Sequence, residues 1–251
     1  MVYYVANDKK NPIIIPDDIK PIGSGNEGVV YNIGGVAVKI INNISLMTEN
    51  KIWNLSQKTP PILIMMPMQP IYDKTGKYSG YIMKLLDCAN AEDVRLNFMH
   101  CDDLIRSINF INNDARLLAE QKVALRDTTL RNAVISNSNN LVNIIDSDRF
   151  ITLEDPECHF TVSQQFIDEN NYWVNKLWYS LFYKMIDLST LFPGADYRTF
   201  RFYMREKLKN AMEQRAVPEF IQEEVKDFNT VEDYMRHKRQ YVKSKGILDK
   251  Y

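Results

Sequence analysis

The sequence predicts an α+β fold, in which a small antiparallel sheet near the N-terminus is followed by a mainly helical remainder. Short β-branched and aromatic runs separated by glycine turns occupy the early part of the chain, a pattern typical of hairpins. Later, apolar residues recur at helical spacing, as in residues 102–122. The 251 residues are 45% hydrophobic and 25% charged, a composition that excludes the disordered class and allows a sizeable core.

The best-defined hairpin spans residues 22–41. Its first strand follows the run G-S-G-N-E-G at 23–28, which fits the pattern G-x-G-x-x-G, and Gly34-Gly35 supplies a tight turn before the second strand. Glycine places no Cβ between backbone and phosphate, so such a hairpin can fold over a triphosphate. The dinucleotide-binding form of this motif leads from a strand into a helix, whereas here it leads into a second strand. Glycines that serve only as turn residues are the alternative.

Lys39 lies inside the apolar run 36–41. A lysine in such a position is costly unless its ammonium meets an anion. A triphosphate is one candidate, and a carboxylate on the following helix is another. Glu49 is the first acidic residue after Lys39, within a predicted helix over 45–57 for which Ser45 is a suitable N-cap. We therefore expect an ion pair between Lys39 and Glu49.

Two further segments carry polar residues in a fixed order. The run V-A-L-R-D-T-T-L-R-N-A-V-I over 123–135 contains Asp127 and Asn132. A polar turn and an apolar strand over 141–145 follow, and the strand ends at Asp146. An ordinary turn residue is the alternative interpretation of Asp146.

Taken in order, the glycine-rich hairpin, the strand lysine, the R-D-x-x-x-x-N run and the strand-terminal aspartate resemble the motifs of the protein kinase family. The resemblance is to a compact bacterial-type form and covers roughly residues 20–190. It implies two lobes: an N-lobe with a small antiparallel sheet over 1–86 and a mainly helical C-lobe over 87–251. It also implies ATP and Mg²⁺ as cofactors, catalytic roles for Lys39, Asp127 as base and Asn132, and Mg²⁺ held by Asn132 and Asp146.

The resemblance also assigns the nucleotide pocket. Segments 68–73 and 80–86 resemble the two strands that lead to the hinge, which places Met83 at the gatekeeper position. The backbone of Lys84 and Leu85 is then expected to meet adenine. The residues expected to bind ATP are Gly23, Ser24, Gly25, Gly28, Val30, Ala37, Lys39, Glu49, Met83, Lys84 and Leu85.

Several positions depart from the family pattern. Leu125 replaces the histidine of H-R-D, and Thr129 replaces a catalytic-loop lysine that helps to neutralise the transferred phosphoryl group. Arg131 is a candidate substitute for that charge. The D-F-G triplet reads D-S-D at 146–148, so Asp148 either binds a second metal ion or caps the next turn.

The helical part is expected to contain a long helix over 102–122, a buried helix over 172–186, and two or three helices after residue 194. Kinases begin the buried helix with an aspartate that anchors the catalytic loop. Asp168, Asn171 and Asn175 are equal candidates for that anchor.

Charge and cysteine content narrow the functional classes. A formal net charge of −1 argues against a nucleic-acid or membrane-surface role. The three cysteines, Cys88, Cys101 and Cys158, have neither metal-ligand spacing nor a disulfide framework, which favours a reducing compartment. No segment has the length and apolarity of a membrane span, so a cytoplasmic protein is expected.

Three functions remain open. The first is an active serine/threonine-type protein kinase with a protein substrate. The second is a pseudokinase that serves as a binding module, which the retained Lys39, Asp127, Asn132 and Asp146 oppose and the lost D-F-G glycine favours. The third is an enzyme that keeps ATP but acts on a small molecule or transfers AMP. The sequence does not predict the oligomeric state.

Overall fold

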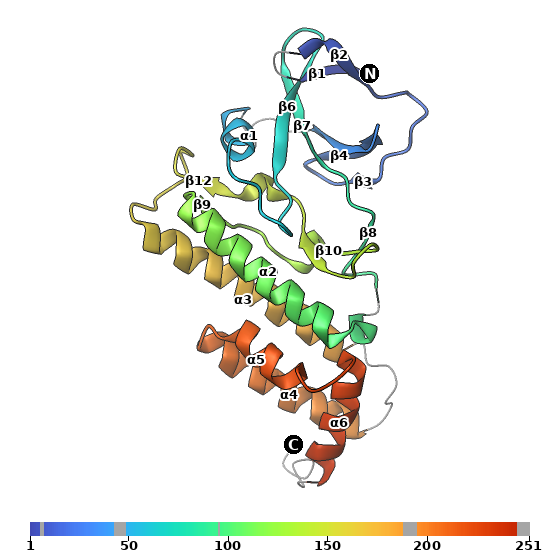
Figure 1. The fold of residues 1–251 in the computed structure, drawn as a ribbon, viewed down its shortest axis with the longest axis vertical. Coiled ribbons are helices and arrows are strands. Elements are labelled where there is room, and N and C mark those ends of the chain that lie inside the picture. Colours follow the sequence, from blue (N-terminus) through green and yellow to red (C-terminus); the bar gives the residue numbers. More distant parts are fainter. Residues whose placement is uncertain (6–7, 43–48, 95, 188–194, 245–251) are drawn as a thin grey trace.

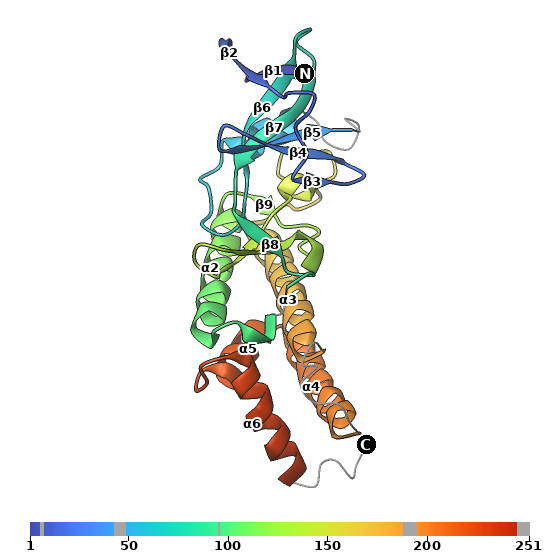
Figure 2. The ribbon, with the colours of Figure 1, turned by 90° about the vertical axis from the view of Figure 1, so that its right-hand side faces the viewer.

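A computed structural model of the chain describes residues 1–5, 8–42, 49–94, 96–187 and 195–244. The fold is a mixed α/β arrangement, with a large antiparallel sheet at one end and most of the helices at the other (Figure 1). The same division is visible after a quarter turn (Figure 2), where the smaller strands lie between the sheet and the helices. Across the described ranges, no helix is long and apolar enough to cross a membrane.

The large sheet has seven strands in the order β2-β1-β6-β7-β5-β4-β3, and every neighbouring pair is antiparallel. The first two strands lie outside the hairpins that the sequence predicts, because Pro12 and charged residues interrupt their apolar pattern. The strands are β1 (Val2–Val5), β2 (Asp8–Ile14), β3 (Gly23–Ser24), β4 (Gly28–Ile33), β5 (Val36–Ile41), β6 (Pro67–Asp73) and β7 (Tyr78–Lys84).

The hairpin of β4 and β5 confirms the sequence prediction. Its pairs run from Gly28 opposite Ile41 to Ile33 opposite Val36. Gly34 and Gly35, with φ of 58° and 86°, form the turn. Both values lie in the left-handed region that favours glycine, so the G-G dipeptide fixes the register of the strand that carries Lys39.

Short elements connect the sheet to the helices. Helix α1 (Glu49–Ser56) packs against β6; the proposed N-cap Ser45 lies outside the described residues. Strands β8 (Cys88–Asn90), β10 (Ala133–Ser136) and β11 (Val142–Ile144) form a three-stranded sheet, and β9 (Val123–Ala124) pairs with β12 (Ile151–Thr152). The 3₁₀ turns are η2 (Leu96–Phe98), η3 (Leu130–Asn132) and η4 (Ser147–Arg149).

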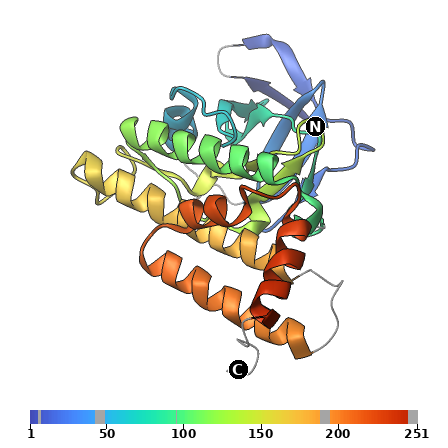
Figure 3. The ribbon, with the colours of Figure 1, turned by 60° about the horizontal axis from the view of Figure 1, so that its bottom comes forward.

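The predicted long helix is confirmed as α2 (Cys101–Glu120), which lies beside α3 (Ser163–Asp187) (Figure 3). Helix α3 begins at Ser163 rather than near residue 172, because Phe166 and Asn170 extend its buried face. Three helices follow, α4 (Ala195–Glu213), α5 (Val217–Val225) and α6 (Val231–Ser244). Pro218 lies in the first turn of α5, where its missing N–H has no partner within the helix to lose.

The largest hydrophobic core lies among the helices. Helix α3 supplies its centre, where Trp178 and Leu181 are fully inaccessible to solvent and Phe182 is almost so. Trp173 and Tyr179, which the sequence also places in the core, are only partly buried against it. This core gives the loops between β9 and β12 a rigid base.

Candidate functional site

The glycine-rich turn joins β3 to β4. The N–H of Gly25 donates to the carbonyl oxygen of Gly28 at 2.9 Å and closes the turn. A Cβ at Gly28 would collide with the carbonyl oxygen of Ile40 on the adjacent strand. Gly28 is therefore required by the close approach of β4 to β5, which is a structural requirement independent of any ligand.

Lys39 projects from β5 and is 5% exposed. Its ammonium forms ion pairs with Asp146 and with Asp148, the latter at 2.5 Å. Burial lowers the pKa of this lysine, but the two carboxylates outweigh burial and raise it above its ordinary value. The cost of a lysine in an apolar strand is thus offset by two anions from a distant part of the chain.

Asp146 and Asp148 flank the start of η4 and differ in environment. Burial and the neighbouring Asp148 carboxylate raise the pKa of Asp146 to about 7. Burial also acts on Asp148, but hydrogen bonding with Asp146 and the charge of Lys39 hold its pKa below the ordinary value. Two carboxylates share one ammonium, so ionisation of both would leave one negative charge that Lys39 does not neutralise. Of the two, Asp146 is the one that takes up a proton first.

Asp127 and Asn132 lie together in the loop after β9. The Asn132 amide nitrogen donates to the backbone carbonyl of Asp127 at 2.8 Å and lies 3.5 Å from its carboxylate. Asp127 has φ of 53°, and Asp146 has φ of 64°. Left-handed backbone at a non-glycine residue costs of order 1 kcal/mol and concentrates at functional sites, so both aspartates are held by their surroundings.

The two loops are joined by the small sheet. Strands β10 and β11 pair Ala133 with Ile144, and the N–H of Ile145 donates to the carbonyl oxygen of Asn132 at 2.8 Å. Asn132, just before β10, and Asp146, just after β11, therefore lie at the same end of this strand pair.

The loop anchor is Asn170, which the sequence analysis did not include among its candidates. Its side-chain oxygen accepts from the N–H of Leu125 at 2.7 Å, and its nitrogen donates to the carbonyl oxygens of Ala115 and Val123. Asn170 is 1% exposed. Its position on the same helical face as Phe166 and Val174 is the sequence signal that could have identified it.

We expect Asn170→Ala to destabilise the protein by about 3 kcal/mol, because three buried backbone groups lose a partner. The matched control is Asn171→Ala, at an exposed neighbour in the same helix, which should stay within about 0.5 kcal/mol. Urea unfolding measures both. Equal losses would contradict the anchoring role.

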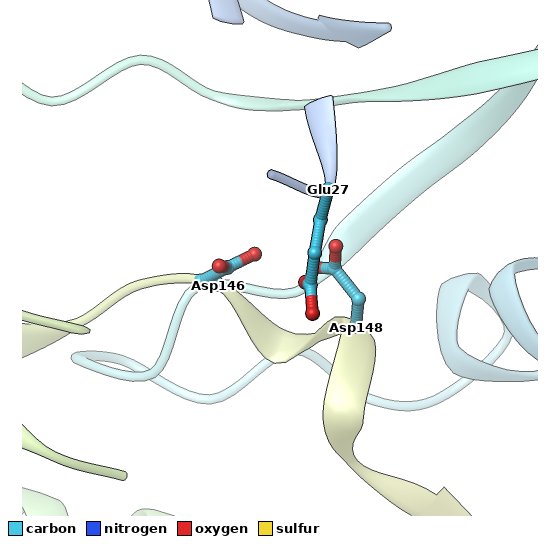
Figure 4. Close-up of side chains that lie close together, drawn as sticks. All are labelled: Glu27, Asp146 and Asp148. Atoms are coloured by element: carbon cyan, nitrogen blue, oxygen red, sulfur yellow. The ribbon is translucent and has the colours of Figure 1, made fainter. Parts of the chain in front are cut away.

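Glu27 lies within the glycine-rich turn and belongs to the carboxylate cluster near Lys39. The motif comparison did not identify it, because the motif leaves this position unspecified. Its carboxylate points toward Asp146 and Asp148 (Figure 4), and one carboxylate oxygen from each of the three lies within 4.8 Å of the others. Arg149, at the end of η4, forms an ion pair with Glu27. The turn is therefore tied down onto the segment that carries the two aspartates.

Glu27→Gln should tighten nucleotide binding by about threefold to tenfold, because it removes an anion beside the expected phosphate position and frees Arg149. Glu213→Gln, the same change at an exposed position of α4, is the control. Titration with a fluorescent ATP analogue measures both. Weaker binding in Glu27→Gln would instead make Glu27 a metal ligand.

The expected ion pair between Lys39 and Glu49 is wrong. Glu49 is the first residue of α1, and its carboxylate accepts a hydrogen bond from the hydroxyl of Tyr72 on β6 at 2.7 Å. Burial and this contact raise the pKa of Tyr72 to about 12. Glu49 is exposed at the sheet, and the acids that meet Lys39 come from the far end of β11 instead.

The other expected nucleotide residues lie on strands β3, β4, β5 and β7 and in the connection after β7. Val30 pairs with Lys39 across β4 and β5, and Ala37 pairs with Met83 across β5 and β7. Lys84 ends β7 and Leu85 follows it in the connection to β8. Gly23 and Ser24 form β3, beside β4. The register places Val30 beside Lys39, whereas Met83 and Lys84 lie opposite Ala37 and Val36, nearer the start of β5.

The two arginines that precede Asp127 and Asn132 pair with acids other than Asp146 and Asp148. Arg131 is 83% exposed at its side chain and lies 3.9 Å from Glu92. Arg126 pairs with Glu169 of α3 at 3.2 Å. Arg149, by contrast, is close enough to Asp127 and Asp148 for both carboxylates to raise its pKa, after the larger effect of Glu27.

A pocket of about 450 Å³ opens beside Asp127. A volume of this order is typical of small-molecule or side-chain binding sites. Its lining residues are Arg126, Asp127, Arg149, Ile151, Glu157, His159 and Trp173.

Comparison of the sequence with protein-family models gives no matching family, and comparison with curated proteins gives no matching relative.

Proposed function

We propose that the protein is an ATP- and Mg²⁺-dependent phosphotransferase of the protein-kinase type, with lobes divided near residues 86 and 87. One observation carries the proposal. Lys39 and Asp146 are 107 residues apart in the chain yet form an ion pair in which Lys39 is buried and Asp146 is partly exposed, directly below the glycine-rich turn that bears Glu27. Asp127 and Asn132 lie on the adjoining loop.

The residues divide the chemistry among them. Backbone N–H groups of the glycine-rich turn and the ammonium of Lys39 hold the triphosphate. Asp127 accepts the proton of an acceptor hydroxyl that enters through the pocket beside it. Arg149, rather than the exposed Arg131, supplies the positive charge that the loop loses at Thr129.

The donor set fits a divalent cation. Burial and the neighbouring Asp148 carboxylate raise the pKa of Asp146, and a bound cation would favour its ionised form. The amide oxygen of Asn132, just before the adjacent strand β10, is a suitable second ligand. When bound, Mg²⁺ would neutralise charge on the phosphate oxygens. Because burial and Asp148 raise the pKa of Asp146 to about 7, Asp146 would release a proton near neutral pH on holding the ion.

A serine or threonine hydroxyl of a protein is the proposed acceptor. Incubation with Mg²⁺ and ATP labelled at either the α- or the γ-phosphate, with mixed protein acceptors, tests this. Label from the γ-phosphate on serine or threonine supports the proposal. Label from the α-phosphate would identify AMP transfer instead, and transfer to small molecules alone would exclude a protein substrate.

A further inference from the structure

We infer that Asp148 is a positioning residue: it is the fixed counter-ion of Lys39. The sequence analysis expected Glu49 to be that counter-ion. This role rests on the nucleotide-binding function proposed above. It also removes Asp148 from the set of metal ligands, so that the two aspartates of the D-S-D triplet have different tasks.

Both carboxylate oxygens of Asp148 already have strong donors. Oδ2 lies 2.5 Å from Nζ of Lys39, and Oδ1 accepts from the hydroxyl of Tyr81 at 2.5 Å. The two donors are cross-strand neighbours on β5 and β7, so the sheet itself fixes their spacing. The side chain of Asp148 is 0% exposed. A metal ion at this carboxylate would compete with a buried, charge-assisted hydrogen bond.

Asp146, unlike Asp148, is partly open to solvent and has a carboxylate oxygen that does not bond to Lys39. Its side chain is 33% exposed, it faces Glu27 across the site, and its hydrogen bond to Lys39 uses only Oδ1. Asp146 can therefore turn toward a cation while Asp148 stays in place.

Helix α1 is held in an orientation that keeps Glu49 away from Lys39. Ile52 and Leu55 are buried beneath the helix, and Lys51 lies 3.9 Å from Asp155, in the segment after η4. With Glu49 bonded to Tyr72, the position of Lys39 depends on η4 and not on α1.

The ion pair with Asp148 affects the free energy of the buried Lys39 ammonium. A buried ammonium that loses its only counter-ion costs several kcal/mol. With Asp148 in place, Asp146 can leave Lys39 for a metal ion without that cost. Without Asp148, Lys39 loses its fixed position, and the phosphates of a nucleotide meet its ammonium less well whether or not a metal ion is bound.

The test is the dissociation constant of ATP, measured with Mg²⁺ and with chelator, for wild type, Asp148→Asn and Glu49→Gln. Asparagine keeps an acceptor for Tyr81 but removes the ion pair. We expect Asp148→Asn to weaken binding about tenfold under both conditions, so that the ratio with and without Mg²⁺ is preserved, and Glu49→Gln to bind like wild type.

Three results would overturn the role of Asp148. Loss of the Mg²⁺ ratio in Asp148→Asn would make it a metal ligand. Unchanged or tighter binding in that variant would mean that the carboxylate only repels phosphate. Weaker binding in Glu49→Gln, with Asp148→Asn unaffected, would restore Glu49 as the partner.

A second readout needs no nucleotide. The rate at which acetic anhydride acetylates Lys39, followed by mass spectrometry of the folded protein, should rise several-fold in Asp148→Asn and stay at the wild-type value in Glu49→Gln. A merely structural role would lower thermal stability without changing this rate. If wild type binds no ATP, the proposed function fails, while the acetylation rates still decide which carboxylate holds Lys39.

Discussion

Asp127→Asn should lower the rate of phosphoryl transfer by about 10²- to 10⁴-fold while nucleotide affinity stays unchanged. The amide cannot accept the proton of the attacking hydroxyl. It preserves the loop, because Asn132 donates mainly to the backbone carbonyl of residue 127, which the substitution retains. Transfer from γ-labelled ATP and titration with an ATP analogue give the two quantities.

The control is Asp227→Asn, the same change at an exposed residue between α5 and α6, which should transfer phosphate at the wild-type rate. If Asp127→Asn also did so, Asp127 would not be the base. A parallel loss of ATP affinity would mean that the aspartate holds the nucleotide instead.

The second large effect concerns Asp146. Asp146→Ala should reduce ATP affinity in the presence of Mg²⁺ by about 100-fold, or about 2.8 kcal/mol, and leave affinity in chelator nearly unchanged. The variant should still fold, because Lys39 keeps Asp148 as a buried partner. Calorimetric titration with and without Mg²⁺ measures the difference.

Asp148→Asn is the matched comparison, since it alters the other carboxylate of the same 3₁₀ turn. It should retain the Mg²⁺ enhancement that Asp146→Ala loses. If both variants lost the enhancement equally, both carboxylates would be metal ligands.

The parts of the fold that the sequence predicts well are those with strong local signals. The turn at Gly34 and Gly35 has a backbone conformation that favours glycine, and so fixes the hairpin that presents Lys39. The 20-residue helix α2 has an unbroken apolar stripe. The start of α3 was predicted too late, because its first turns are polar and exposed except at Phe166 and Asn170, which meet β9 and the residue after it.

The sequence indicated several residues that lie close together in the structure, but not which of them form ion pairs and hydrogen bonds with one another. Spacing along the chain identified Asp127, Asn132 and Asp146, because these residues sit at the ends of recognisable strands. Spacing also favoured Glu49 as the partner of Lys39, and that prediction was wrong. Whether Glu49, Asp146 or Asp148 meets Lys39 depends on how η4 packs beneath β5. Those two elements are more than 100 residues apart in the sequence, so spacing along the chain does not reveal their contact. Asn170 and Glu27 act through similar long-range contacts.

The most direct test of the central claim is the thermal stability of the wild-type protein with ATP alone, with Mg²⁺ alone and with both. A ligand that binds only the native state raises stability by mass action, about 2.7 kcal/mol at 100 times its dissociation constant. The proposed nucleotide site predicts a large upward shift of Tm that requires both ligands. No shift at millimolar ATP with Mg²⁺ would contradict it, and would make the fold a binding module rather than an ATP-dependent enzyme.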